Sequence, residues 1–298
     1  MRRALVLSGG GCRGAFEVGA LDYLIREAGE DYHIFLGTSV GALNAALIGQ
    51  AQGRGELIKL VGLLKEIWLN LKGSRSVFAG SVLGPARLLF SDALFDPAGL
   101  RELLRRHLDS DRLFSTANVV KVSAVAMETG ELLYACNKNP GLKGDFSRYV
   151  LASASIPLFF PAVVIDGKHW YDGGLRDVTP LGAVFQEQPD EIMVIVTMPL
   201  TEDLRPKLPE TRVGGVFHRL LRAVDILTGE IAANDLQLAV AVNKCLQRFP
   251  GRRAVPIRVI SPEQPLAGDG PLDFNPDRIR ENMRLGYEAA HRPRLIAG

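Results

Sequence analysis

Two stretches near the N-terminus carry most of the information about the fold: residues 4–14 read ALVLSGGGCRG and residues 33–48 read HIFLGTSVGALNAALI. Each begins with a short apolar run, which is typical of a buried strand, and passes through glycines into a segment with helical spacing. After the first run, Phe16, Ala20 and Leu24 recur four residues apart. Two strand–turn–helix units in succession predict a parallel sheet flanked by helices.

The remaining chain continues to alternate between strand and helix patterns. One hairpin is expected over 119–136, and a second over 163–171, where Asp166-Gly167 favours a type I′ turn. No internal repeat and no convincing domain boundary is found, so we expect residues 1–298 to form a single domain. The other predicted elements are helices over 57–71 and 216–249, strands over 192–197 and 257–260, and a final helix after Pro276.

The composition excludes several classes of protein. The chain has 298 residues, with 35 basic and 33 acidic side chains and a formal net charge of +2, and 47% of its residues are hydrophobic. These values exclude a disordered chain, a collagen-like repeat and a strongly cationic nucleic-acid-binding protein. The three cysteines show no CxxC spacing, and the apolar run Ala4–Leu7 is too short for a secretion signal. We therefore expect a cytoplasmic protein without a nucleic-acid partner.

The glycine-rich turn at residues 9–14, GGGCRG, is the first candidate site. It matches G-x-G-x-x-G, but a dinucleotide site also needs an acidic residue after the second strand, and that strand ends in Leu36-Gly37-Thr38-Ser39. Successive glycines before a helix can point several N–H groups at one anion, either a phosphate or the transient oxyanion of acyl transfer. A plain turn that lets strand and helix pack closely is the alternative.

Residues 37–41, GTSVG, are the second candidate site, because they fit G-x-S-x-G between a strand and a helix. This is the context of a nucleophile elbow, in which Ser39 projects from a sharp turn. The alternative is that Ser39 only caps the following helix.

A nucleophilic serine needs a base. None of the five histidines has a position that recommends it, whereas Asp172-Gly173-Gly174 follows the second hairpin and would expose a carboxylate. A Ser–Asp dyad requires burial to raise the pKa of Asp172 above its reference value of about 3.9. Otherwise Asp172 is a turn residue, and His169 is the rival base.

Four motifs in this order resemble those of the bacterial patatin-like phospholipases: residues 9–14, 37–41, 152–157 (ASASIP) and 172–174. They lie within residues 5–180, and the later residues match no motif. The resemblance implies an α/β fold, a three-layer α/β/α sandwich with a mainly parallel central sheet. It also implies that Ser39 is the nucleophile and Asp172 the general base. The implied oxyanion hole consists of Gly10, Gly11 and Arg13, with motif support from Gly9, Gly14, Gly37, Gly41, Gly173 and Gly174.

The resemblance further implies a serine hydrolase of lipid esters, phospholipids and lysophospholipids being the favoured substrates, with an acyl-enzyme intermediate and neither metal nor other cofactor. Acyl transfer to another acceptor and a non-catalytic lipid-binding protein are the alternatives. We expect Ser153 and Ser155 to be structural and Cys12 to be a small apolar filler. Residues 73–97 either fill the core or form a cap or a peripheral membrane contact. The oligomeric state stays open.

Overall fold

The computed structural model describes residues 1–80, 93–210, 214–246, 254–266 and 270–298. A nine-stranded mixed sheet runs in the order β11-β10-β9-β1-β2-β5-β8-β7, with β6 paired to β5 off this path. Its five central strands, from β10 to β5, are parallel, and antiparallel strands extend both ends. The strands are β1 (Arg3–Leu7), β2 (Ile34–Gly37), β5 (Val119–Ala126), β6 (Leu132–Cys136), β7 (Val163–Ile165), β8 (Lys168–Asp172), β9 (Glu191–Ile195), β10 (Ile257–Ile260) and β11 (Arg294–Ala297); a separate pair joins β3 (Ala79–Gly80) to β4 (Phe95–Asp96).

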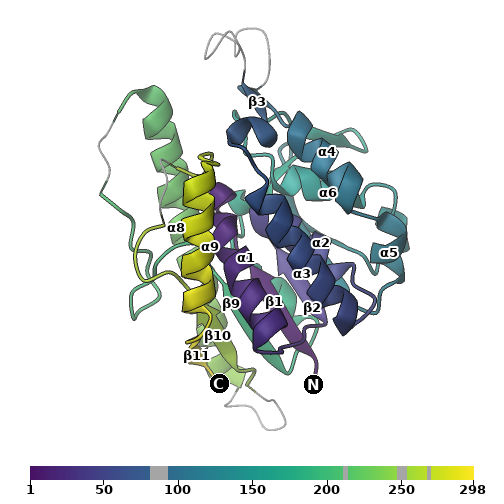
Figure 1. Cartoon of the computed structure of the whole chain (residues 1–298), viewed down its shortest axis with the longest axis vertical. Helices are drawn as coiled ribbons and strands as arrows, with labels where there is room; N and C mark the ends of the chain where they lie inside the picture. The colour runs from purple at the N-terminus through teal and green to yellow at the C-terminus, as the bar shows by residue number, and fades with distance from the viewer. Residues whose placement is uncertain (81–92, 211–213, 247–253, 267–269) are drawn as a thin grey trace.

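Helices cover both faces of the sheet, because successive strand residues point to opposite sides. On β1, Leu5 and Leu7 join a core with α1, α2, α3 and α9, whereas Ala4 and Val6 join a second core with α7 and α8. Figure 1 shows α1, α3 and α9 lying across one face. The predicted three-layer α/β/α sandwich is confirmed. The helices are α1 (Gly14–Leu21), α2 (Val40–Gly49), α3 (Arg54–Leu69), α4 (Ala98–His107), α5 (Ser110–Ser115), α6 (Phe146–Ser153), α7 (Leu181–Phe185), α8 (Val216–Leu246) and α9 (Pro276–Ala289).

The predicted local elements are largely present. Both strand–turn–helix units form as expected, and both hairpins pair antiparallel as β5–β6 and β7–β8. Asp166 and Gly167 have φ values of 50° and 75°, as a type I′ turn requires. Within the described ranges, no helix combines the length and the apolar character that a membrane crossing requires.

Strand β5 brings two distant parts of the chain to one edge. Val119–Val122 pair with β2, and Ala124–Ala126 pair with β8, while β6 occupies the opposite edge. Strand β8 therefore continues the position of β2 beyond the point where β2 ends. Because β2 and β8 run in opposite directions, their C-terminal ends meet at the middle of β5.

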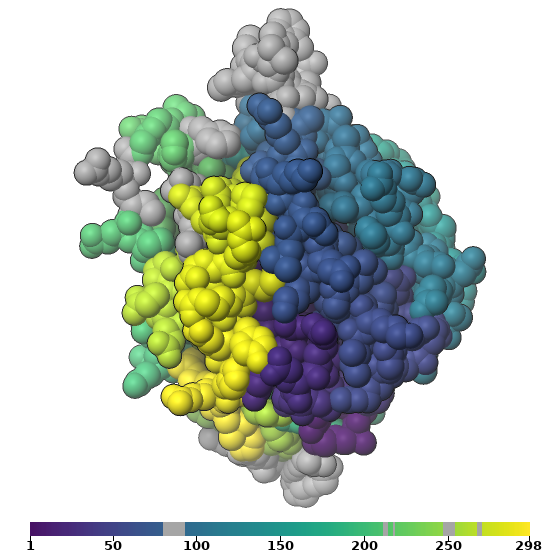
Figure 2. All heavy atoms as spheres, viewed as in Figure 1, coloured from purple at the N-terminus to yellow at the C-terminus, as the bar shows by residue number. Residues whose placement is uncertain are grey.

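Helix α9 packs directly on α1. An added Cβ at Gly19 would lie 1.8 Å from the carbonyl oxygen of Met283, and one at Gly286 would lie 1.9 Å from that of Phe16. The two helices therefore touch backbone to backbone, which only glycine permits at both positions. Figure 2 shows the yellow C-terminal helix pressed against the purple N-terminal segment. The C-terminal region thus holds the helix that follows the glycine-rich turn.

Part of the apolar segment 73–97 belongs to the core. Val77, Phe78 and Leu94 are buried, and the ring of Phe78 contacts those of Phe160 and Phe274. For these residues the core-filling alternative holds. Val82, Leu83, Leu88, Leu89 and Phe90 lie outside the described residues.

Candidate active site

Ser39 stands on a sharp turn between β2 and α2. Its φ of 57° and ψ of −126° lie in a region that side chains other than glycine rarely adopt, as expected of a nucleophile elbow. The turn fits because Gly41 approaches β1 closely: an added Cβ there would lie 2.3 Å from the carbonyl oxygen of Leu7. Gly14, Gly37 and Gly173 are equally crowded, since a Cβ at each would lie within 2.5 Å of a neighbouring atom. Gly9 is less crowded, and its Cβ would lie 3.2 Å from that of Ser39.

Asp172 ends β8, and it lines the same cavity as Ser39. The Gly174 N–H donates to Asp172 Oδ1 at 2.8 Å, and the Ser39 hydroxyl lies close enough to the carboxyl to lower its pKa. Burial raises the pKa of Asp172 to about 7, although the Gly174 N–H and the Ser39 hydroxyl act to lower it. The carboxyl is therefore poised between its neutral and ionised forms near neutral pH, which suits a general base.

Ser153 and Ser155 hold the backbones of the two residues in place. The Ser39 N–H donates to Ser153 Oγ at 2.9 Å, and the Asp172 N–H donates to the Ser155 carbonyl oxygen at 3.0 Å. Ser153 and Ser155 thus contact both candidate catalytic residues, in the supporting role predicted for them.

Ser123 of β5 lies between the two strand ends, and its role was not predicted from the sequence. Its hydroxyl shares a 2.7 Å hydrogen bond with that of Thr38, and an added Cβ at Gly173 would come within 2.0 Å of Ser123 Oγ. One signal was available, because Ser123 is a polar residue inside the otherwise apolar run 119–126.

The glycine-rich turn places two unpaired donors at the same cavity. Among the described residues, the N–H groups of Gly10 and Gly11 have no hydrogen-bond acceptor. Gly11 has a φ of 58°, and a Cβ there would lie 2.0 Å from the Pro271 carbonyl oxygen. Unpaired N–H groups beside a nucleophile are the arrangement that stabilises an oxyanion.

Distant segments support this turn. Thr197 Oγ1 donates to the Gly9 carbonyl oxygen at 2.7 Å, and the Cys12 N–H donates to that of Pro271 at 2.7 Å. Burial raises the pKa of the Cys12 thiol to about 11, so the thiol is protonated near neutral pH. This agrees with the filler interpretation of Cys12.

Arg13 does not stand free beside the glycines. Its guanidinium makes two hydrogen bonds, of 3.0 and 2.9 Å, to the carboxylate of Asp225 on α8. Its positive charge is therefore largely neutralised by Asp225, and its predicted part in the oxyanion hole stays a prediction. The pair ties α8 to the glycine-rich turn.

The rival base lies elsewhere. His169 is exposed at the start of β8, and its Nδ1 lies 2.6 Å from Glu128 Oε1. It lines neither of the cavities that Ser39 lines, whereas Asp172 lines one of them. Among the described residues, no three His, Cys, Asp or Glu side chains cluster as metal ligands would.

Two cavities meet at Ser39. The first, about 930 Å³ including its mouth, is lined mostly by apolar side chains, among them Leu43, Leu64, Trp68, Phe78, Leu104 and Phe160. The second, about 920 Å³, contains Ser39, Asp172 and the turn at Gly9–Gly11, with the exposed side chains of Leu158 and Leu175 at its rim. Ser39 therefore faces an apolar channel on one side and a more polar chamber on the other.

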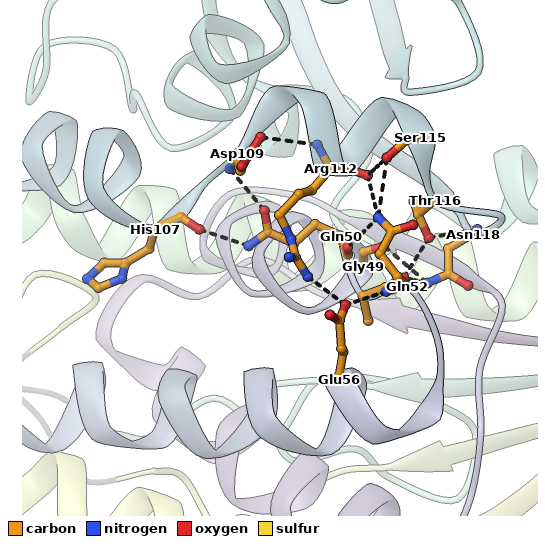
Figure 3. A network of polar contacts seen from close by, with 11 residues as sticks. Gly49, Gln50, Gln52, Glu56, His107, Asp109, Arg112, Ser115, Thr116 and Asn118 are labelled. Carbon is orange, nitrogen blue, oxygen red and sulfur yellow. Dashed lines mark hydrogen bonds and ion pairs between the residues drawn. The ribbon is translucent and has the colours of Figure 1, made fainter.

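A polar network around Gln50 includes His107, which lines the apolar channel (Figure 3). The Gln50 side chain donates to the His107 carbonyl oxygen at 2.8 Å and accepts from the Asp109 N–H at 2.9 Å. Gln50 thus clamps the chain on both sides of Leu108, which lines the channel together with His107. The His107 ring points away from the network in Figure 3.

Comparisons with known proteins identify the family of the chain. The family model described as "Patatin-like phospholipase" matches residues 5–185. The "Uncharacterized protein YjjU" of Escherichia coli is 26% identical over 293 residues, which cover 96% of this chain and 75% of that protein.

A "cGAMP-activated phospholipase" of Pseudomonas aeruginosa is 30% identical over 187 residues. That match covers 59% of this chain and 53% of the relative, so it spans about half of the relative's length. Among solved structures, VipD from Legionella pneumophila aligns with 97% of this chain and 66% of its own, at 12% identity and a TM-score of 0.46.

Proposed function

Because the chain belongs to the patatin-like phospholipase family, we propose that it hydrolyses carboxylic esters of lipids, phospholipids or lysophospholipids, with a Ser39–Asp172 dyad. The observation that carries this proposal is a buried Asp172 carboxyl with a pKa of about 7 in the same cavity as the Ser39 hydroxyl. Both groups line the same cavity as the unpaired N–H groups of Gly10 and Gly11.

The reaction proceeds through two acyl transfers. Asp172 takes the Ser39 proton as Ser39 Oγ attacks the ester carbonyl, and the resulting oxyanion accepts hydrogen bonds from the N–H groups of Gly10 and Gly11. The protonated Asp172 then gives its proton to the departing alcohol, leaving an acyl-enzyme. Water, deprotonated by Asp172, attacks the acyl-enzyme and releases the fatty acid, which restores Ser39.

The two cavities suit different parts of the substrate. An alkyl chain gains about 0.8 kcal/mol for each CH₂ group that it buries, so the apolar channel beside Ser39 suits the acyl chain. The second cavity, which holds the dyad and the glycine-rich turn, suits the alcohol portion. The relative named as a phospholipase supports a lipid ester as the substrate.

The exposed apolar residues at the mouth of the second cavity are suited to contact with a lipid surface. Leu158 is 49% exposed and Leu175 is 44% exposed, and both line that cavity. We propose a cytoplasmic enzyme that touches the membrane peripherally with this rim.

The dyad can be tested with a fluorophosphonate probe, which labels activated serines. Wild type, Ser39→Ala and Asp172→Asn are incubated with the probe, and mass spectrometry locates the adduct. We expect labelling at Ser39 in wild type, none in Ser39→Ala and strongly slowed labelling in Asp172→Asn. Equal rates for Asp172→Asn and wild type would reject Asp172 as the base, and a folded wild type that stays unlabelled would favour a non-catalytic lipid-binding protein. Analysis of the products with and without added alcohol separates hydrolysis from acyl transfer.

A further inference from the structure

A third cavity opens beside the catalytic one. It has a volume of about 1090 Å³ including its mouth. It shares Arg13, Thr197, Met198 and Asp225 with the second cavity, which contains both Ser39 and Asp172. We call it the Arg222 cavity, after the α8 residue in its wall. Because Thr197 also bonds the glycine-rich turn, this space borders the site where the ester would react.

The lining of the Arg222 cavity carries excess positive charge. Arg13, Lys207 and Arg222 face it, and Asp225 is the one carboxylate among its described lining residues. Since Asp225 is paired with Arg13, the charges of Lys207 and Arg222 have no carboxylate partner in the described part of the chain. His218 adds further hydrogen-bonding capacity at the rim.

One nitrogen of the Arg222 guanidinium lacks a hydrogen-bond acceptor in the described part of the chain. That nitrogen, Nη1, is buried from solvent. A buried guanidinium N–H without a partner is unfavourable, and an acceptor bound nearby is one explanation for such a group. An arginine fork with a nearby lysine charge is the arrangement that recognises phosphate oxygens.

We propose that the Arg222 cavity binds the phosphate group of the lipid substrate. This inference rests on the proposed function: the acyl chain enters the apolar channel, the ester carbonyl lies at Ser39, and the phosphate lies beyond Thr197 against Arg222 and Lys207. The enzyme then prefers acyl esters that carry a phosphate to neutral glycerides with the same acyl chain.

The test compares two lipids that differ only in the phosphate. Initial rates are measured for 1-palmitoyl lysophosphatidic acid and for 1-palmitoylglycerol in the same neutral mixed micelles, and the ratio of their kcat/KM values is the readout. We expect this ratio to fall about 10- to 100-fold in Arg222→Gln, because a charge-assisted hydrogen bond to the phosphate is lost. Lys207→Gln should lower it less, and Arg222→Lys should restore part of it, since the charge returns without the fork.

Arg219→Gln is the matched control. Arg219 lies one turn earlier on the same helix, is exposed, and lines none of the three cavities. We expect its ratio to equal that of wild type. An unchanged ratio in Arg222→Gln, or an equal fall in Arg219→Gln, would overturn the proposal, the second by showing general surface attraction.

Inorganic phosphate distinguishes a lipid headgroup from a free phosphate. If the site takes the headgroup, inorganic phosphate should inhibit lysophosphatidic acid hydrolysis competitively, and this inhibition should weaken in Arg222→Gln. If inorganic phosphate instead accelerates 1-palmitoylglycerol hydrolysis, the cavity is an effector site and the headgroup assignment is wrong.

A binding measurement keeps this inference separate from the catalytic proposal. Glycerol 3-phosphate is titrated calorimetrically into Ser39→Ala and into the Ser39→Ala/Arg222→Gln double variant. Binding to the first protein only supports the phosphate site even if no lipid is hydrolysed, and absence of binding to both counts against it. Failure of fluorophosphonate labelling would reject the catalytic proposal alone.

Discussion

The carboxyl of Asp172 is the group whose chemistry depends most on its surroundings. Below its pKa of about 7 it is protonated and cannot accept the Ser39 proton. We therefore predict that kcat/KM for a neutral ester rises with pH through a midpoint near 7. Initial rates measured from about pH 5 to about pH 9 test this, and a midpoint near the reference value of about 3.9 would contradict it.

The same pKa has a consequence for stability. The pKa of Asp172 in the folded state, about 7, lies above the unfolded value of about 3.9. The contribution of Asp172 to the free energy of unfolding is therefore greatest below about pH 4 and falls as the pH rises towards 7. The Asp172→Asn variant should lack this loss. The difference between its free energy of unfolding and that of wild type, measured by denaturant unfolding, should therefore change between about pH 4 and about pH 7.

Ser153 is predicted to maintain the strained elbow. In Ser153→Ala the buried N–H of Ser39 loses its acceptor, at a cost of about 1–3 kcal/mol, so we expect kcat to fall roughly 10-fold or more. Ser155→Ala is the matched control, because its hydroxyl bonds only the carbonyl oxygen of Leu151. Steady-state kinetics on both variants decide the matter, and equal effects would argue against this role for Ser153.

The sequence predicted local turns of the site better than the contacts made by distant segments. The turns at Ser39 and Asp172 were predicted because glycines within a few residues mark them. Asp225, Thr197 and Pro271 were not, because each reaches the glycine-rich turn from far along the chain and has no distinctive neighbours in the sequence.

At the scale of elements, the backbone contact between α1 and α9 should tolerate no side chain at its glycines. Gly286→Ala places a methyl group against the Phe16 carbonyl oxygen, and we expect a loss of about 1–3 kcal/mol in the free energy of unfolding. Gly62→Ala on α3 is the control: its Cβ would meet nothing within 4 Å, so it should gain about 0.5–1 kcal/mol. Urea unfolding measures both, and a neutral Gly286→Ala would contradict the close packing.

The Gln50 clamp should affect the length of acyl chain that is accepted. Gln50→Ala leaves the His107 carbonyl and the Asp109 N–H without their partner, at a cost of about 1–3 kcal/mol, and loosens the chain around Leu108. We expect kcat/KM to fall more for long-chain than for short-chain p-nitrophenyl esters. Gln52→Ala, which removes the hydrogen bonds of the Gln52 side chain in the same network but leaves the partners of the Gln50 side chain in place, should leave the chain-length profile unchanged.

Helix α6 and strand β11 were not predicted, for reasons visible in their composition. Helix α6 has the sequence FSRYVLAS, in which Phe146, Tyr149 and Val150 are residues that are also common in strands. Strand β11, with the sequence RLIA, is an edge strand whose Leu295 is 61% exposed, so it lacks the buried apolar run that marked β1 and β9.

For the whole molecule, we predict one cooperative folding unit. The family model ends at residue 185, yet β1 pairs with β9 along its full length, and β9 begins at Glu191. A fragment of residues 1–185 would leave one edge of β1 unpaired and remove α8 and α9 from both faces. We expect circular dichroism to show this fragment unfolded and the full chain to melt in one transition. A folded fragment would indicate two units instead.

The supports of the glycine-rich turn also bear on protein synthesis. Thr197 and Pro271 hold that turn, and both leave the ribosome long after Ser39 and after Asp172. A nascent chain therefore carries the candidate nucleophile Ser39 before the contacts that hold the glycine-rich turn can form. The proposed lipid hydrolysis would, by this order of assembly, begin only after Pro271 has been added to the chain.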